Sequence, residues 1–273
     1  MRDVECVRFL QWALPRMRLH WPGFRKVRGV VCKRVARRRL TLGLADIDAY
    51  RALLERDAAE WHVLETLCPI PISRFWRDRA VFEHIEREVL PTLAQAANAA
   101  GRAALECWSA GCASGEEPYT LAMLWRLRLQ SGFPGLRLRV LATDVDARLL
   151  ERAALGCYRA SSLRALPEAL RGQAFERAGE LLCVRPELRA SVEFARQDLR
   201  AELPAGSFDL ILCRNVVLTY FEPRLQRETM RRMMEHLRPG GALVVGLHEE
   251  PPAALEGLAP WPGLRATYRK AGA

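Results

Sequence analysis

The spacing of apolar residues along the chain changes near residue 100. Before that point apolar positions recur at intervals of three and four, as in 47–54, which is the period of a helix packed on one face. Asp46 directly precedes this segment and is expected to cap it. Residues 77–100 read as a further helix pair, broken at Pro91. The first hundred residues therefore predict helices and almost no strand.

From residue 105 onward, short apolar runs alternate with helical patterns. The runs DLILC at 209–213 and ALVVG at 242–246 are apolar at nearly every position, which is typical of strands buried on both faces. Strands that alternate with helices predict a doubly wound, mainly parallel α/β sheet. We expect the strands at 105–109, 136–143, 192–196, 208–213 and 242–247, and the helices at 118–129, 148–154 and 223–237.

The same patterns divide the chain. A helical, basic domain with a linker helix is expected over residues 1–90, and the sheet-containing domain over 91–273. Residues 157–191 interrupt the alternation of strands and helices and are interpreted as an insertion in the second domain. The chain of 273 residues is long enough for this division.

The loop after the first predicted strand, residues 110–115, consists of small residues and is followed by Glu116 and Glu117 at the start of a helix. In an open α/β sheet this is where a ligand binds, at the carboxyl end of a strand. The loop has neither the G-x-G-x-x-G spacing nor a Walker lysine, and two carboxylates would repel a pyrophosphate. They suit a ligand that carries positive charge, such as the ammonium and sulfonium groups of S-adenosylmethionine.

Polar residues also stand at the ends of the next three predicted strands. Because the carboxyl ends of parallel strands share one edge of a sheet, these residues should converge with the glutamates on one crevice. Asp144 there could accept both hydroxyl hydrogens of a ribose. Asp198 could accept from an adenine amino group, and Leu199 could pack on the ring. Arg214 and Asn215 follow the fourth strand, and Tyr220 comes one short turn later. The set favours a nucleoside pocket.

The charge of the chain is concentrated at its beginning. The formal net charge is +10, and the first forty residues hold twelve arginines and lysines against two acidic residues. This asymmetry indicates an electrostatic docking surface for an acidic protein, an anionic membrane or nucleic acid; a solvated helix face is the other interpretation. We expect no stable membrane insertion, since no apolar run is long enough to span a bilayer.

Eight cysteines occur, without a C-x-x-C pair. Each is interpreted as a buried structural thiol, and no metal site is expected because no His/Cys cluster has ligand spacing. No signal-peptide pattern precedes the helices, so a cytoplasmic location is expected. Nothing in the sequence requires more than a monomer.

Several stretches of the chain resemble the chemotaxis receptor glutamate methyltransferases, the CheR family. They are ISRFWRD (72–78), WSAGCASGEEPYT (108–120), TDVDARLLERAALGCY (143–158), FDLILCRNVVLTYF (208–221) and LRPGGALVVGLHEE (237–250). The resemblance implies a small N-terminal helical domain, a Rossmann-like class I methyltransferase domain and a small β-subdomain inserted in the latter. It also implies S-adenosylmethionine as cofactor and the acidic helices of a chemoreceptor-like protein as substrate, docked on the basic N-terminal segment.

The resemblance carries roles to individual positions. Ser73 stands where the family usually has a cofactor-contacting threonine, and Arg77 matches the arginine that reaches toward cofactor and substrate. Glu117, together with Glu116, matches the acidic contact to the methionine portion. The remaining cofactor contacts implied are Asp144 for the ribose, Asp198 and Leu199 for the adenine, and Arg214 and Asn215 along the pocket. Tyr220 matches the tyrosine beside the transferred methyl, so Arg77 and Tyr220 are the expected catalytic residues.

Three departures from the family pattern are visible. Pro71 replaces the usual asparagine, Asp198 replaces a frequent asparagine, and GLHEE at 246–250 replaces the usual G-H-S-E. Two other functions stay open at the level of sequence. The same fold could methylate RNA or a small molecule, although no aromatic RNA-binding platform is apparent. A non-catalytic module that binds the cofactor or a receptor is the other alternative.

Overall fold

The computed structural model of the protein describes residues 2–70, 72–253 and 255–272. The chain forms two compact units, one made of Met1–Pro71 with Val217–Gln226, and the other of Ile72–Val216 with Arg227–Ala273. The boundary predicted at residues 90/91 falls inside the second unit, because the helical residues 79–99 pack on the sheet of that unit. No helix within the described part of the chain has the length and apolarity to cross a bilayer.

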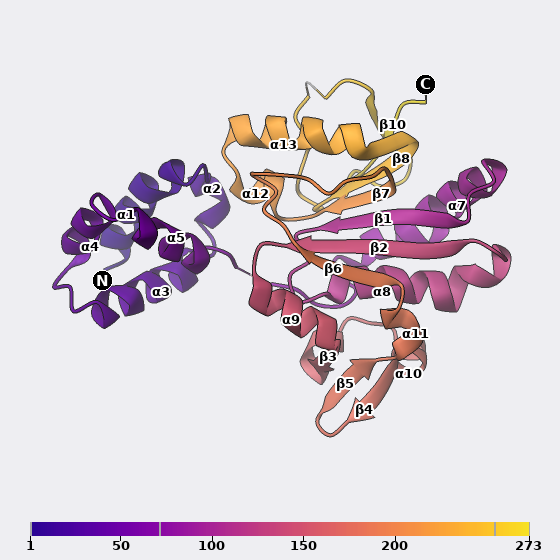
Figure 1. Cartoon of the computed structure of the whole chain (residues 1–273), viewed down its shortest axis with the longest axis horizontal. Helices are drawn as coiled ribbons and strands as arrows, with labels where there is room; N and C mark the ends of the chain where they lie inside the picture. Colours follow the sequence, from indigo (N-terminus) through magenta and orange to yellow (C-terminus); the bar gives the residue numbers. More distant parts are fainter. Residues whose placement is uncertain (1, 71, 254, 273) are drawn as a thin grey trace. The chain divides into compact units, whose positions relative to one another are not determined.

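The first unit is helical, as the sequence predicts. Its helices are α1 (Asp3–Arg16), α2 (Trp21–Phe24), α3 (Arg28–Thr41), α4 (Ile47–Leu54), α5 (Ala58–Leu67) and the short α12 (Val217–Tyr220) (Figure 1). Asp46 caps α4 as predicted, accepting from the Ala49 N–H at 2.8 Å. The core is formed by residues such as Phe9, Leu14 and Leu64.

A buried ion pair ties three of these helices together. The Glu60 carboxylate of α5 accepts from Arg38 of α3 at 2.7 and 3.0 Å, and from the Tyr50 hydroxyl of α4 at 2.8 Å. Glu60 is only 4% exposed. The Arg38 hydrogen bonds hold the pKa of Glu60 below its ordinary value, which keeps this carboxylate ionised in the helical unit.

The second unit is built on a mostly parallel sheet, which confirms the predicted α/β fold. Its strands are β1 (Ala104–Ala110), β2 (Arg137–Asp144), β6 (Val192–Arg196), β7 (Phe208–Cys213), β8 (Leu237–Val245), β9 (Leu258–Pro260) and β10 (Thr267–Lys270). They lie in the order β6-β2-β1-β7-β8-β10-β9, with β10 antiparallel to both of its neighbours. The parallel register sets Ser109 beside both Ala142 and Leu212, so the carboxyl ends of β1, β2 and β7 meet at one edge.

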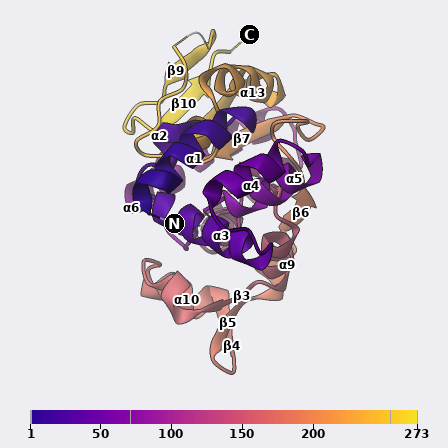
Figure 2. The ribbon, with the colours of Figure 1, turned by 90° about the vertical axis from the view of Figure 1, so that its left-hand side faces the viewer.

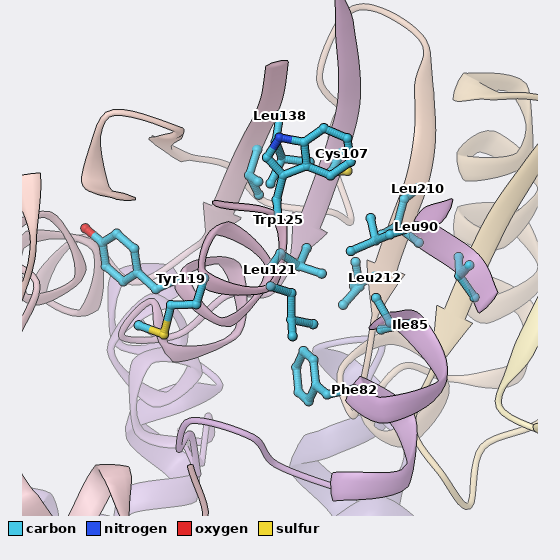
Figure 3. Close-up of a cluster of buried hydrophobic side chains, with 14 of the residues drawn as sticks. Phe82, Ile85, Leu90, Cys107, Tyr119, Leu121, Trp125, Leu138, Leu210 and Leu212 are labelled. Atoms are coloured by element: carbon cyan, nitrogen blue, oxygen red, sulfur yellow. The ribbon is translucent and has the colours of Figure 1, made fainter. Parts of the chain in front are cut away.

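Helices cover the sheet and bury its apolar runs. They are α6 (Arg79–His84), a π-helical segment Ile85–Val89, α7 (Leu90–Ala99), α8 (Glu116–Leu124), a second π-helical segment Trp125–Leu129, a 3-10 turn Gln130–Gly132, α9 (Ala147–Leu155) and α13 (Pro223–His236). Figure 3 shows Phe82 of α6, Leu121 of α8 and Leu212 of β7 close together, with Leu90 of α7 beside Leu210 of β7, all in one buried cluster. The break predicted at Pro91 is wrong: the helix continues from α6 to α7 through the π-helical segment Ile85–Val89, which lies directly before the turn that contains this proline.

The insertion predicted at 157–191 is a small β-subdomain. It contains β3 (Cys157–Arg159), a 3-10 turn Ala160–Leu163, α10 (Glu168–Ala174), β4 (Phe175–Ala178), β5 (Leu181–Val184) and α11 (Pro186–Arg189), with the strands in the order β3-β5-β4. Figures 1 and 2 both show it at the end of this unit opposite to β9 and β10. Its Tyr158 hydroxyl donates to the Ser114 carbonyl at 2.7 Å, which anchors the subdomain to the loop after β1.

The interpretation of all cysteines as buried thiols is wrong for two pairs. Cys6 of α1 is bonded to Cys32 of α3, and Cys157 is bonded to Cys183, its direct partner across β3 and β5. Each pair is 26 residues apart in sequence, so only helix packing and strand pairing bring the sulfur atoms together. The other cysteines, 68, 107, 112 and 213, are buried and form no disulfide, as predicted.

Candidate functional site

The loop between β1 and α8 folds back on the end of β2. The N–H groups of Gly111 and Cys112 both donate to the Thr143 carbonyl, at 2.8 and 2.9 Å. Gly111 has a φ of +79°, and a Cβ atom there would lie 2.5 Å from Cγ2 of Val216. Only glycine meets both conditions without strain. The loop therefore consists of closely packed small residues, and it lies at the edge where an open α/β sheet binds ligands.

The two glutamates that follow this loop have different surroundings. Glu117 accepts from the Ser109 hydroxyl at 2.8 Å and from Nη1 of Arg214 at 3.0 Å. Glu116 is 1% exposed and accepts from the Ser114 hydroxyl at 2.8 Å within the loop. Glu117 faces the pocket described below, whereas Glu116 stabilises the loop from inside.

Arg214, at the end of β7, is the centre of a buried polar cluster. Its side chain is 3% exposed and forms ion pairs with Asp78 at 2.6 Å and with Glu117 at 3.0 Å. It also donates to the Arg77 carbonyl at 3.0 Å and lies 5.2 Å from the centre of the Phe82 ring. Its Nε is buried and has no hydrogen-bond partner among the described residues. One cation therefore joins the end of β7 to α8 and to the segment before α6.

Several of these groups line a pocket in the second unit. Of the residues predicted for the site, the structure brings together Ser73, Arg77, Glu117, Arg214 and Asn215 around it. The lining is completed by Ile72, Arg74, Phe82, Gly111, Cys112 and Ala113.

The backbone around this pocket is unusual. Ala113, Asn215 and Asp78 have φ values of +49°, +56° and +61°, a region that residues other than glycine seldom adopt. Ala113 and Asn215 line the pocket, and Asp78 holds Arg214. Backbone strain of this kind persists where the surrounding contacts enforce it, and it concentrates at ligand sites.

Asp144 does not itself line the pocket but shapes the loop that does. Its two carboxylate oxygens accept from the N–H groups of Ala113, at 2.8 Å, and Asp146, at 3.0 Å. Burial raises the pKa of Asp144 above its ordinary value, although these backbone N–H groups act in the opposite direction. The residue predicted to bind a ribose thus also fixes the position of Ala113.

Asp198 and Leu199 lie beyond β6 and outside the pocket lining. Both oxygens of Asp198 accept from the side chain of Arg200, the shortest contact being 2.7 Å. Burial raises the pKa of Asp198, but the hydrogen bonds from Arg200 outweigh it and hold the pKa below its ordinary value. Leu199 is 6% exposed. An adenine amino group would share this carboxylate with Arg200.

Tyr220 is the predicted site residue that belongs to the first unit. It ends α12, its ring centre is 4.9 Å from that of Phe24, and its carbonyl accepts from the His20 N–H at 2.7 Å. The structure therefore groups it with α2 of the helical unit, and its catalytic role stays a prediction.

Sequence reasoning missed several residues of the site, and three of them make specific contacts. Asp78 pairs with Arg214, Phe82 lies against the same guanidinium, and Glu249 accepts from the Asn215 N–H at 2.9 Å. Asp78 and Glu249 both lie inside stretches that carry the family resemblance, so their acidic side chains were visible as a signal. Their partner atoms lie 136 and 34 residues away in sequence, so no local pattern reveals the pairing.

The chain is similar to known proteins over most of its length. The family model described as "CheR methyltransferase, SAM binding domain" matches residues 72–257. The chemotaxis protein methyltransferase of Escherichia coli (strain K12) is 36% identical over 231 residues, which is 82% of this chain and 76% of that protein. The chemotaxis protein methyltransferase of Listeria monocytogenes is 35% identical over 197 residues, 72% of each chain.

A further relative is much longer. An uncharacterized 104.1 kDa protein of Rhodobacter capsulatus is 35% identical over 218 residues, which is 80% of this chain but only 23% of that protein. The family match spans the loop with Glu117, the strand end with Arg214 and the inserted β-subdomain. The predicted fold and cofactor are thereby confirmed: the chain belongs to the CheR methyltransferase family, and its second unit carries the S-adenosylmethionine-binding domain of that family.

Proposed function

We propose that this chain transfers the methyl group of S-adenosylmethionine to glutamate side-chain carboxylates of a chemoreceptor-like protein. The observation that carries the proposal is a single pocket lined by a carboxylate, Glu117, and by the guanidinium of Arg77. The Glu117 carboxylate fits a cationic cofactor, and the Arg77 guanidinium fits an anionic acceptor. The chemotaxis protein methyltransferases among the relatives support the same reaction.

The donor set fits the cofactor. S-adenosylmethionine supplies an electrophilic methyl group on a sulfonium, next to an ammonium and a carboxylate. Glu117 offers one carboxylate at the pocket surface, and we assign it to the cationic end of the cofactor. Gly111 lets the loop lie directly against Val216, since a Cβ atom there would be 2.5 Å from Cγ2 of that residue. Asp144 is assigned to the ribose hydroxyls, and Ser73 contributes a hydroxyl to the lining.

The remaining assignments follow the same logic. Asp198 and Leu199 are proposed to contact the adenine, and Arg214 and Asn215 to form the wall of the pocket. Glu116 supports the loop rather than the cofactor in this proposal, because its carboxylate is buried on Ser114.

Arg77 is proposed to orient the acceptor carboxylate. One of its nitrogens, Nη1, donates to the Ile72 carbonyl at 2.6 Å, which fixes the side chain at the pocket. A planar guanidinium can still pair with a carboxylate through two parallel N–H bonds. A glutamate is already ionised near neutral pH, so the reaction needs no general base. Tyr220 is proposed to hold the same carboxylate or to restrict the methyl group.

Catalysis then rests on orientation and on the removal of water. Holding two reactants in line is worth about 7–11 kcal/mol of the barrier. The negative acceptor and the positive cofactor neutralise each other during transfer, so a pocket that excludes water favours the transition state over separated ions.

The basic first unit is proposed to dock the acidic substrate helices. Several α3 cations are used inside the unit: Arg34 donates to the Leu67 carbonyl at 3.0 Å, and Arg38 pairs with Glu60. Lys33 and Arg37 are exposed on the same helix. Exposed cations of this kind attract an acidic partner at low salt and do so less as the ionic strength rises.

The test uses radiolabelled S-adenosylmethionine, the purified chain and a membrane extract from its own host. Carboxyl methyl esters release methanol in alkali, so the volatile, base-labile label is counted. The variant Arg77→Ala should lose most of this label while its cofactor affinity stays within about threefold of wild type, since Arg77 acts on the acceptor. Arg79→Ala is the matched control, because Arg79 forms an exposed pair with Glu83 on the surface of α6.

Two results would contradict the proposal. Label that is stable in alkali would point to another acceptor and not to a glutamate ester. An equal loss of turnover and cofactor affinity in Arg77→Ala would assign this residue to the cofactor instead of the acceptor.

A further inference from the structure

Glu249 reaches from the turn after β8 to the ends of two neighbouring strands. Its Oε2 accepts from the N–H of Gly246, at 2.6 Å, and from the N–H of Asn215, at 2.9 Å. The Glu249 N–H in turn donates to the Gly246 carbonyl at 2.9 Å, which closes the turn. One carboxylate thus binds backbone donors that follow β7 and β8. Such charge-assisted bonds are about twice as strong as neutral ones.

Within this turn, Glu249 alone among the acidic and polar side chains points inward. Leu247, His248 and Glu250 are exposed, whereas Glu249 is half-buried. Glu250 forms an exposed ion pair with Arg265 at the surface. Two acidic residues in succession therefore have separate surroundings, and only the first contacts the strand ends.

The residue that Glu249 binds is a strained part of the pocket wall. Asn215 lines the pocket and has a φ of +56°. Asparagine tolerates this conformation better than most residues but does not prefer it. A Cβ atom on Gly246 would lie 2.7 Å from Oε2 of Glu249 and 3.0 Å from Oδ1 of Asn215. Gly246, Glu249 and Asn215 are therefore in close contact with one another, and a side chain at position 246 would have no room.

We infer that Glu249 is a positioning residue for the cofactor pocket. It acts through Asn215: by accepting the Asn215 N–H it holds the left-handed backbone, and this sets where the Asn215 side chain meets the cofactor. Without the carboxylate the segment after β7 can relax toward ordinary φ values, and the pocket wall moves. The inference rests on the proposed contact between Asn215 and the cofactor, and not on the identity of the methyl acceptor.

The test measures the dissociation constant for S-adenosylmethionine by calorimetry in the full chain. Glu249→Ala should raise it about 10-fold or more, because the charge-assisted bond to Asn215 in the pocket wall is lost together with the one to Gly246. Glu249→Gln keeps an oxygen that accepts from both N–H groups and should stay within about threefold of wild type. Glu250→Ala, one residue away, is the control and should leave the constant unchanged.

A second perturbation reaches the same contact from the other side. Gly246→Ala places a methyl group against both Oε2 of Glu249 and Oδ1 of Asn215, and should also raise the dissociation constant. Gly246→Ala replaces Glu249→Ala in the test if the latter variant yields too little folded protein. In the Asn215→Ala background, Glu249→Ala should have little further effect, since the two residues act in series.

The inference is overturned if folded Glu249→Ala binds the cofactor as wild type does. It is also overturned if the effects of Glu249→Ala and Asn215→Ala are additive, or if Asn215→Ala alone leaves the constant unchanged. A purely structural role would lower the melting temperature without changing cofactor affinity, and would show no rescue by Glu249→Gln.

Discussion

Arg214 offers the sharpest test of the pocket architecture. Replacing it with alanine removes the cation that lies between Asp78 and Glu117, at 2.6 and 3.0 Å, together with its bond to the Arg77 carbonyl. Removing one member of a buried ion cluster costs about 3–5 kcal/mol, because the remaining charges stay desolvated without a partner. The side chains of Asp78 and Glu117 are 26% and 15% exposed, so water screens part of this cost. We therefore expect a loss of about 3 kcal/mol in the free energy of unfolding.

The assay is urea unfolding near neutral pH, followed by circular dichroism and tryptophan fluorescence. Adding Glu117→Gln to the Arg214→Ala variant should recover part of the loss, because it removes one of the two charges left without a partner. Arg265→Ala is the control: its ion pair with Glu250 is 91% and 74% exposed, and its removal should change stability little. A loss below about 1 kcal/mol for Arg214→Ala, the range of exposed pairs, would refute the reasoning, as would the absence of any recovery.

Three further predictions concern stability. Hydrogen bonds to Glu60 lower its pKa, so the stability it contributes is present above the ordinary value of 4.5 and lost as the pH falls below it; unfolding curves of wild type and Glu60→Gln should differ near neutrality and converge in acid. Gly111→Ala should impair cofactor binding and folding, since its Cβ would lie 2.5 Å from a side chain. Gly135→Ala is the control: Gly135 has a φ of +88° and open space around it, so the free energy of unfolding should fall by only about 1 kcal/mol. Equal losses of the two variants in thermal denaturation would contradict this prediction. Replacing Cys6 and Cys32 by serine should lower the free energy of unfolding by about 3 kcal/mol in urea titrations, because their bond closes a loop of 26 residues, and an unchanged midpoint would disprove it.

Some parts of the fold could be read from local sequence. Strands of a parallel sheet are buried on both faces, so β7 and β8 leave near-continuous apolar runs that no surface element would carry. The interruption at 157–191 stood out because it breaks the alternation, and it is a separate three-stranded sheet in the structure. The late antiparallel strands β9 and β10 were missed, since each is only three or four residues long and carries too little pattern.

The candidate site was predicted in part, for a similar reason. Polar residues at the ends of apolar runs identified Glu117, Arg214 and Asn215, because parallel strands bring their carboxyl ends to one edge. The sequence could not show which of Glu116 and Glu117 faces the pocket. The two residues are neighbours at the start of α8, and the helix points their side chains in different directions. It also treated Asp198 as free to bind adenine, whereas Arg200 already binds both of its oxygens.

The sequence by itself therefore determined the class of fold, the insertion, the family and five of the eleven residues that line the pocket, because each of these is encoded in local periodicity or in short motifs. Tertiary structure decided which distant groups meet: Arg214 with Asp78, Glu249 with Asn215, and the cysteines of the two disulfides. These pairings depend on strand order and helix packing, and residues far apart in the chain carry no local signal of their contact. The positive φ angles at the pocket are likewise decided by tertiary structure, since they persist only where such long-range contacts enforce them.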